Sequence, residues 1–353
     1  MPFYRAAGTV PKKRHTKAER PDGGLYAEEL MSAHGFSGMT SLLYHRGLPT
    51  TIVEAEVFEG PTDEARPNHP LLPRHFRTGQ IGDGADLVTG RQLLMANRQV
   101  RIGFARASGA SSLYRNAMAD ECVFIQSGEA ILESVFGELP ARSGDYVVIP
   151  KSTTHRWVPA GEVRALVLEL SGHVDIPRRY RSPEGQLLES APYSERDLRG
   201  PSPTEPVDGE GVEVLVHHGT GLWTRYVYAT HPFDVVGWDG WIYPFAFNIG
   251  DFEPRVGRVH LPPPIHQTFE APGAVICSFC PRPYDFDKNA IAVPYNHANV
   301  DSDEVLFYVA GDFMSRKGSG IESGSISLHP AGFVHGPQPG SVEAAFGEPG
   351  TEE

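Results

Sequence analysis

One spacing pattern of glutamate, glycine, proline and histidine occurs twice in the chain, and it constrains the fold more than any other feature. The C-terminal copy consists of Glu304, Gly311, Gly324, Pro330 and His335. The N-terminal copy consists of Glu121, Gly128, Gly144, Pro150 and His155. In both copies seven positions separate the glutamate from the first glycine, six the second glycine from the proline, and five the proline from the histidine. A duplicated pattern of this kind predicts two structural repeats in tandem.

The segments that carry the pattern have the composition of short β-strands. Their apolar runs are brief and are interrupted by glycine, proline and aspartate; the chain has 38 glycines and 31 prolines. The clearest runs are 146–149, 165–170, 212–216 and 304–309. Such runs are typical of sandwiches and barrels, and the two-part pattern resembles the cupin signature. We therefore predict an all-β fold, a tandem cupin of two jelly-roll barrels with few short helices.

Helical periodicity is scarce, and the best helix candidates are Leu25–Met31 and Gly90–Ala96. The segment 181–211 is rich in proline, serine, glutamate and glycine, which favours a connection between the halves. We place the N-terminal barrel at residues 1–190 and the C-terminal, catalytic barrel at residues 191–353.

His297, Glu304 and His335 are the predicted metal ligands of the C-terminal barrel. A small barrel brings inward-facing ligands from distant parts of the sequence to one ion. Two imidazoles and one carboxylate leave other coordination positions open, which is typical of non-haem Fe(II) oxygenases. The usual signature has a further histidine where Asn299 stands, so one more position is free for a chelating substrate. The alternative is that both histidines merely line the barrel, without an ion.

The N-terminal copy lacks a full ligand set. Tyr114 and Asn116 stand where the other copy has its first histidine and its asparagine, so only Glu121 and His155 remain. Two ligands seldom hold a catalytic metal. We expect the first barrel to be structural, with Glu121 and His155 hydrogen-bonded to each other or to the backbone.

The charge balance and the cysteine content exclude several classes of function. The 31 Lys and Arg against 44 Asp and Glu give a net charge of -13, which opposes tight binding to nucleic acid or to an anionic membrane. No apolar run has the length of a membrane span and no signal peptide is evident, so we expect a cytoplasmic protein. The three cysteines provide no disulfide framework.

Six stretches, spread over most of the chain, together resemble the homogentisate 1,2-dioxygenases, in their shorter bacterial form. They are Gly23–Leu30, Ser41–Arg46, Val235–Gly240, His260–Glu270, Asn296–Glu304 and Ser327–Gly336. The resemblance implies an Fe(II) enzyme that uses O2 to open the ring of homogentisate. Its product would be maleylacetoacetate, in the breakdown of tyrosine and phenylalanine.

The resemblance also assigns roles to single residues. The metal triad of the family falls on the three residues already chosen, and its general base falls on His260. A neutral histidine can take a phenolic proton near pH 7; the alternative is that His260 only caps a strand. The predicted substrate-binding residues are His329, His335 and His266. The implied partners are a small aromatic substrate and O2, and the family suggests a homo-oligomer, a trimer or a hexamer.

One position departs from the family. Longer members have a substrate-contacting tyrosine where this chain has Phe313, which cannot donate that hydrogen bond. Tyr295, Arg316 and Lys317 are candidates to replace it. An alternative function is therefore a related dioxygenase for another para-dihydroxy aromatic, such as gentisate or a hydroquinone of specialised metabolism. A cupin isomerase or a binding module is a further alternative, although such proteins usually keep the histidine that Asn299 replaces.

Overall fold

The regular secondary structure is almost entirely β-strand in the computed structural model, which describes residues 3–61, 64–311, 313, 316 and 318–352. Within these residues the only α-helix is α1 (Ser341–Ala344). The 3₁₀ helices are η1 (Thr78–Gln80), η2 (Arg178–Tyr180), η3 (Glu195–Asp197), η4 (Ile249–Asp251) and η5 (Pro263–His266). The predicted all-β fold with few short helices is confirmed. None of the described helices is long and apolar enough to cross a membrane.

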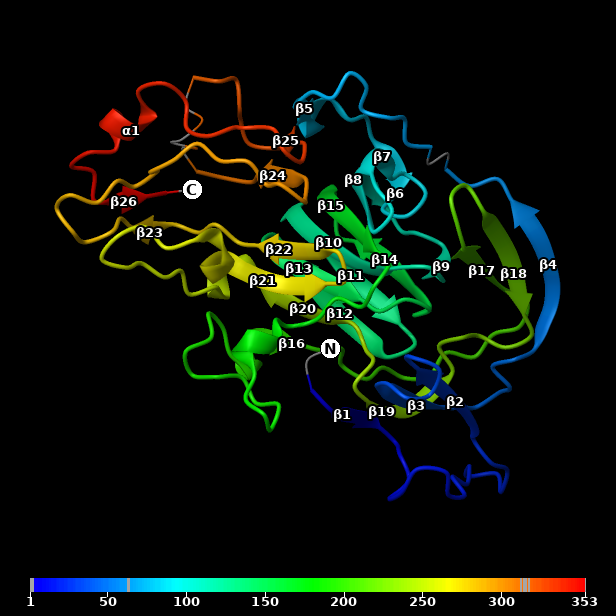
Figure 1. Ribbon diagram of the computed structural model, residues 1–353. Helices are drawn as coiled ribbons and strands as arrows, with labels where there is room; N and C mark the ends of the chain where they lie inside the picture. The colour runs from blue at the N-terminus through cyan, green and yellow to red at the C-terminus, as the bar shows by residue number, and fades with distance from the viewer. Residues whose placement is uncertain (1–2, 62–63, 312, 314–315, 317, 353) are drawn as a thin grey trace.

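An eight-stranded sheet occupies the centre of the molecule (Figure 1). In order, its strands are β16 (Leu198–Arg199), β20 (Phe245–Asn248), β13 (Asp145–Ile149), β10 (Asp120–Ser127), β15 (Val163–Leu170), β8 (Val100–Gly109) and β6 (Gly84–Asp86), with β7 (Gln92–Ala96) also paired to β8. Two of the predicted apolar runs are the strands β13 and β15.

Both faces of this sheet are buried, because its central strands carry apolar residues at consecutive positions. On β10, Val123 and Ile125 belong to one buried cluster, whereas Cys122 and Phe124 belong to another. Side chains alternate between the two faces of a strand, so a continuous apolar run is suited to a strand that is covered on both sides.

A seven-stranded sheet encloses the first of these clusters. In order, its strands are β12 (Gly137–Arg142), β11 (Glu129–Ser134), β14 (His155–Pro159), β9 (Leu113–Asn116), β17 (Val212–His217), β18 (Trp223–Tyr228) and β4 (Ile52–Phe58). Leu132 and Trp157 of this sheet pack with Ala105, Val123 and Val147 of the central sheet. The two sheets form the first barrel, and this cluster fills it.

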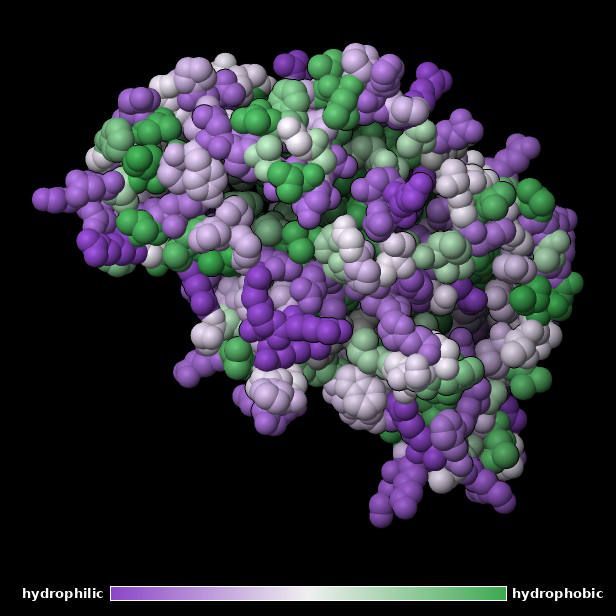
Figure 2. All heavy atoms as spheres, viewed as in Figure 1, coloured by the Kyte–Doolittle hydropathy of each residue, from purple (hydrophilic) through white to green (hydrophobic). Residues whose placement is uncertain are grey.

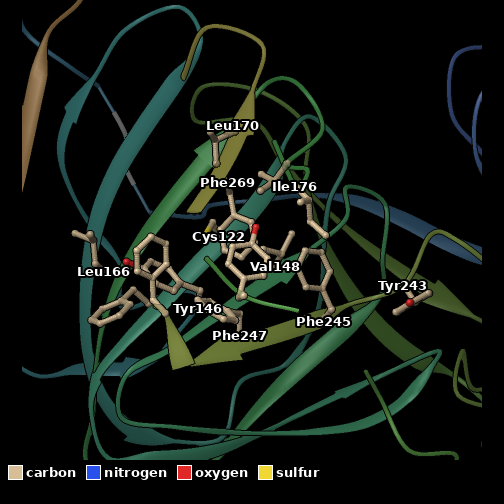
Figure 3. Packing of buried hydrophobic residues seen from close by; sticks show 14 of the residues in the cluster. Cys122, Tyr146, Val148, Leu166, Leu170, Ile176, Tyr243, Phe245, Phe247 and Phe269 are labelled. Carbon is tan, nitrogen blue, oxygen red and sulfur yellow. The ribbon is translucent and has the colours of Figure 1, made fainter. Parts of the chain in front are cut away.

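The second cluster covers the outer face of the central sheet and is rich in aromatic rings (Figure 3). Phe269, on strand β21 (Gln267–Ala271), is fully buried there. Its ring centroid lies 5.9 Å from that of Tyr146, 5.8 Å from Phe245 and 6.1 Å from Phe247. This packing fixes the C-terminal segments against the first barrel.

Two predicted helices are strands. The stretch 25–31 lies largely in β2 (Ala27–Ser32), and the stretch 90–96 lies largely in β7. β2 belongs to a four-stranded sheet whose order is β1 (Arg5–Gly8), β19 (Val235–Gly240), β3 (Thr40–His45) and β2. Both helix predictions were wrong. Exposure along β2 alternates with a period of two through its first four residues, and β2 pairs with β3. Backbone pairing with neighbouring strands therefore outweighs the weak helical propensity of both stretches.

The second copy of the sequence pattern lies in smaller sheets. Their strands are β24 (Glu304–Tyr308), β25 (Ser325–His329) and β5 (Arg74–Arg77) in one sheet, β21 with β22 (Ala274–Cys277) in another, and β23 (Arg282–Pro283) with β26 (Gly350–Thr351) in a third. β5 precedes residue 190, whereas β17, β18 and β20 follow it and join the sheets of the first barrel. The division at residues 190 and 191 stays a prediction.

Candidate metal centre

The second copy of the sequence pattern brings the three predicted metal ligands together. Glu304 begins β24 and lies opposite His329, the last residue of β25. Gly324 precedes β25 with a φ of +85°, a conformation that glycine adopts at little cost. Beyond the strand, the backbones of His297 and His335 exchange two hydrogen bonds, of 2.7 and 2.8 Å. A tight turn and a short bridge therefore position the histidines beside the carboxylate.

The ligand atoms of this group converge on one point. One potential ligand atom from each of His297, Glu304 and His335 lies within 4.8 Å of the other two. The Nε2 of His297 lies 3.2 Å from Oε2 of Glu304, and the Nε2 of His335 lies 3.4 Å from Oε1. The arrangement is a possible metal site, as the spacing of the sequence predicted.

Hydrogen bonds orient two of these ligands. Nδ1 of His335 donates to the carbonyl of Phe333 at 3.0 Å, which leaves the lone pair on Nε2. That Nε2 atom is buried and has no hydrogen-bond partner among the described residues. Asn299 donates to Oε2 of Glu304 at 2.8 Å. A buried acceptor nitrogen beside an oriented carboxylate is what a divalent cation requires.

The electrostatics keep the carboxylate ionised. Partial burial disfavours the charged form of Glu304, but its contacts with His329, His297 and Asn299 outweigh burial and hold its pKa well below the usual range. An ionised carboxylate next to two imidazoles can bind a cation without first losing a proton.

His329 lies directly beside the group. Its ring stacks on that of His335, with 4.0 Å between centroids and an interplanar angle of 16°. Its Nδ1 lies 3.8 Å from Oε1 of Glu304 and is buried without a hydrogen-bond partner in the described part of the chain. His329 is therefore placed to contact a molecule bound at the centre.

His260, the predicted base, reaches the group through a tyrosine. Its Nε2 lies 3.0 Å from the hydroxyl of Tyr295, and the two rings meet edge-on. The ring of Tyr295 in turn meets that of His297 edge-on, with 5.8 Å between centroids. Burial, aided by the charge of Arg282, lowers the pKa of His260, so its imidazole is neutral at pH 7.

The remaining predicted substrate contacts are less directly placed. His266 is buried against Phe279, 4.6 Å between centroids, and burial lowers its pKa to about 4. Phe313 packs on Tyr308, 5.3 Å between centroids, and is 8% exposed. Arg316 donates to the carbonyl of Gly336, next to His335, at 2.6 Å. Lys317 lies outside the described residues.

In the first barrel, Glu121 and His155 do not pair with each other. Nδ1 of His155 donates to the backbone carbonyl of Thr153 at 2.9 Å, as one of the two alternatives predicted. Glu121 instead binds Arg91, a residue that sequence reasoning missed. Arg91 belongs to neither copy of the spacing pattern. The one feature of the sequence that could have drawn attention to it is its position just before an apolar run.

The family model described as "Homogentisate 1,2-dioxygenase N-terminal" matches residues 88–249, a range that ends before the candidate metal ligands. A protein of Saccharolobus solfataricus named "Putative dioxygenase" is 38% identical over 99% of this chain and 91% of its own length.

More distant relatives carry the name homogentisate 1,2-dioxygenase. The Oryza sativa protein is 26% identical over 98% of this chain and 79% of its own length. The Rhodopseudomonas palustris protein is 27% identical over 94% of this chain and 78% of its own length. Among solved structures, a cupin superfamily protein of Desulfitobacterium hafniense matches 33% of this chain and 97% of its own, with 16% identity and a TM-score of 0.23.

Proposed function

Because this chain belongs to the homogentisate 1,2-dioxygenase-like family of dioxygenases, we propose that it opens the ring of homogentisate with Fe(II) and O2. The product is maleylacetoacetate, in the breakdown of tyrosine and phenylalanine. The observation that carries this proposal is the convergence of His297, Glu304 and His335 within 4.8 Å. Fe(II) held by these three ligands would supply open positions for the substrate and for dioxygen.

His260 is the proposed base. Homogentisate must lose a phenolic proton to bind as a chelating anion, and a neutral imidazole can accept it. The depressed pKa of His260 keeps it in that form at pH 7. Since Nε2 of His260 lies against the hydroxyl of Tyr295, that hydroxyl receives the substrate proton and passes its own to His260.

The substrate lies between this pair and His329. The Nδ1 of His329 is buried beside the ligand group and can donate to a ring oxygen of the substrate. His335 contributes its ring face as well as its metal-binding nitrogen. His266 is the next candidate contact, because it follows His260 by six residues in the stretch 260–270.

A second candidate substrate is another para-dihydroxy aromatic, such as gentisate. Phe313 favours it, because this side chain has no hydroxyl and is packed on Tyr308. The acetate arm of homogentisate would then need another partner. Arg316 is the candidate, since its guanidinium donates a hydrogen bond to the carbonyl of Gly336, the residue that follows His335 in the chain.

Oxygen uptake tests the proposal and separates the two substrates. Protein reconstituted with Fe(II) under anaerobic conditions is mixed with homogentisate or gentisate in oxygenated buffer, and the product masses are measured. We expect uptake with homogentisate and an open-chain product that carries both atoms of O2. Oxygen uptake with gentisate alone would reassign the substrate. If protein shown to hold iron took up no oxygen with either compound, the proposed reaction would be contradicted.

Variants of the ligands connect the reaction to the site. His297→Ala and His335→Ala should each lose iron and activity while keeping the circular dichroism spectrum of the parent protein. His218→Ala is the matched control, because the side chain of this exposed histidine bonds to the Thr224 hydroxyl, away from the candidate metal centre. Retention of iron by either ligand variant would contradict the assignment of the triad.

The proposed assembly is a homo-oligomer. Strand β4 forms an edge of the seven-stranded sheet and exposes Ile52, Val53 and Val57 to solvent. Figure 2 shows hydrophobic residues at the right edge of the view, where β4 lies, with hydrophilic ones among them as elsewhere on this face. A strand at the edge of a sheet has unpaired backbone groups that can pair with another chain. Light scattering gives the mass, and a monomer at micromolar concentration would contradict this part of the proposal.

A further inference from the structure

In both copies of the sequence pattern an asparagine donates a hydrogen bond to the glutamate. In the second copy, Nδ2 of Asn299 lies 2.8 Å from Oε2 of Glu304. In the first, Nδ2 of Asn116 lies 3.1 Å from Oε1 of Glu121. The position of Glu121 is therefore that of a metal-binding carboxylate, held by the same kind of donor.

The histidines also match. Nδ1 of His155 donates to a carbonyl two residues back at 2.9 Å, as His335 does at 3.0 Å. His155 pairs with Tyr114 across two strands, just as His335 bridges His297. The Nε2 of His155 is buried without a hydrogen-bond partner among the described residues. The first barrel thus keeps a carboxylate and an imidazole, both oriented as ligands.

The copies differ in two ways. Tyr114 stands in place of the first histidine and donates its hydroxyl to Oε1 of Glu121 at 3.0 Å, and a guanidinium group lies against the glutamate. Nη1 and Nη2 of Arg91 bind the two carboxylate oxygens of Glu121 at 2.7 and 2.8 Å. The guanidinium also lies over the ring of Tyr114, 5.4 Å from its centroid. Nε of Arg91 donates to the carbonyl of Leu87 at 2.8 Å, which fixes the approach of the side chain.

A second carboxylate explains why this place needs a cation. Glu169 on β15 lies directly opposite Glu121 on β10, and both side chains are buried or nearly so, at 13% and 1% exposed. Two like charges in that position repel each other. Arg91 contacts both, with 3.4 Å from Nη1 to Oε1 of Glu169. Burial opposes ionisation of Glu121, yet the charge of Arg91 outweighs it and holds its pKa at about 2.

We propose that the guanidinium of Arg91 takes the place of a metal ion in the first barrel, closing a divalent-cation site formed by Glu121, His155 and Glu169. Without Arg91, the carboxylates of Glu121 and Glu169 would lose the cation that they share, and the charge of Glu121 already acts on the buried imidazole of His155. Oxygen and nitrogen donors of this kind suit Zn²⁺ and Mn²⁺. A cavity of about 50 Å³ is lined by Arg91, Glu169 and Trp223 among others.

The proposed role of Arg91 explains why only the second copy of the pattern has a candidate metal centre among the described residues. A guanidinium offers two parallel donors that match one carboxylate, and it cannot lose its proton at neutral pH. It therefore binds the carboxylates permanently and leaves no place for an exchangeable ion. The inference does not depend on the reaction proposed for the C-terminal centre.

The test counts ions in a protein whose C-terminal centre has been removed. In the His297→Ala/His335→Ala background, the chelator-treated protein is dialysed against Zn²⁺ and the bound ion is measured by mass spectrometry. We expect no tightly bound Zn²⁺ in this background. Adding Arg91→Ala should give about one ion per chain and a melting temperature that rises with Zn²⁺ concentration.

Three further variants keep the test decisive. Arg101→Ala, which removes the half-buried arginine that also contacts Glu169, should bind no ion. Adding His155→Ala to the Arg91→Ala protein should abolish the gained ion. Arg91→Gln fills more of the space and is measured alongside, in case Arg91→Ala folds only with metal. The proposal is overturned if neither Arg91 variant gains an ion or recovers cooperative unfolding with Zn²⁺, or if the gain persists without His155.

Discussion

Asn299 donates a hydrogen bond to Glu304, with 2.8 Å between Nδ2 and Oε2. This bond restrains the carboxylate that would hold the metal. Asn299→Ala should therefore weaken metal binding by roughly 10- to 100-fold, as is typical when a ligand loses its supporting partner. Chelator competition measures the change. Asn68→Ala, at an exposed amide that bonds to the carbonyl of Leu72, is the control; equal affinities in both variants would contradict the role of Asn299.

Asn299→His should have a different effect, because it adds a ligand instead of removing support. A fourth protein ligand would occupy a coordination position that substrate or dioxygen needs. We expect iron content to stay at the parent level while oxygen uptake falls by at least about tenfold. Unchanged uptake in this variant would show that the position is not needed.

Tyr295→Phe removes the hydroxyl that lies 3.0 Å from Nε2 of His260. The base would lose its hydrogen-bonding partner, so kcat should fall while iron content is unchanged. His260→Ala should cost more, on the order of 100- to 10,000-fold, the usual contribution of general base catalysis. Tyr226→Phe is the control. If Tyr295→Phe keeps the parent kcat, the proton reaches His260 by another route.

The pH dependence of kcat/KM follows from the same histidine. Burial lowers the pKa of His260 below its ordinary value of about 6.5. Because a base acts in its neutral form, activity should persist as pH falls through 6.5 and should decline only at lower pH. The acidic limb should disappear from the residual activity of His260→Ala. If the acidic limb of the kcat/KM profile remains in His260→Ala, it reports the titration of a residue other than His260.

His45 predicts how stability depends on pH. Its ring lies 2.6 Å from Asp234 and 3.0 Å from Glu29. Burial disfavours the charged ring, but hydrogen bonds to Asp234 and Glu29 outweigh it and raise the pKa of His45 to about 9. The unfolded chain has a pKa of about 6.5, so this stabilisation is complete below pH 6.5 and is lost as pH rises towards 9. A rise from 6.5 to 9 corresponds to about 3 kcal/mol.

The measurement for His45 is thermal unfolding between pH 6 and 10. The melting temperature of the parent should fall across this range, whereas that of His45→Gln should fall much less. His15→Gln, at an exposed histidine that pairs with Glu28, should follow the parent. Parallel curves for the parent and His45→Gln would rule out this histidine as the cause.

Phe269 joins the C-terminal segments to the outer face of the central sheet, among the rings of Figure 3. Phe269→Ala should destabilise the protein by about 3–5 kcal/mol, the usual cost of such a cavity. Phe286, which is 74% exposed, is the control, and Phe286→Ala should change stability by less than about 0.5 kcal/mol. Urea unfolding followed by circular dichroism measures both.

The sequence predicted those parts of the structure that depend on local patterns. The run 146–149 is strand β13 because every residue in it is apolar and both its faces are buried. The candidate metal ligands could be predicted to lie together because the turns near them require glycine and proline at fixed intervals, as at Gly324. In contrast, the stretch 25–31 has no decisive period, and its pairing with β3 made it a strand.

Arg91 could not be predicted, because its role depends on three segments that meet only in the folded chain. It lies outside the motif, and the carboxylates that it neutralises come from β10 and β15. Nothing near Arg91 in the sequence indicates that two glutamates, at positions 121 and 169, face each other. Likewise, the contact between His260 and Tyr295 joins residues 35 positions apart in two irregular segments.

Strand β20 has a consequence for how the protein is made. It pairs with β13, although some hundred residues separate them in the chain. During synthesis, the edge of β13 stays open until the ribosome has released residues 245–248. Contacts between such distant segments form slowly, and an open strand edge can pair with a neighbouring nascent chain. Folding of the first barrel in the cell is thus exposed to misassembly until well after its own residues have emerged.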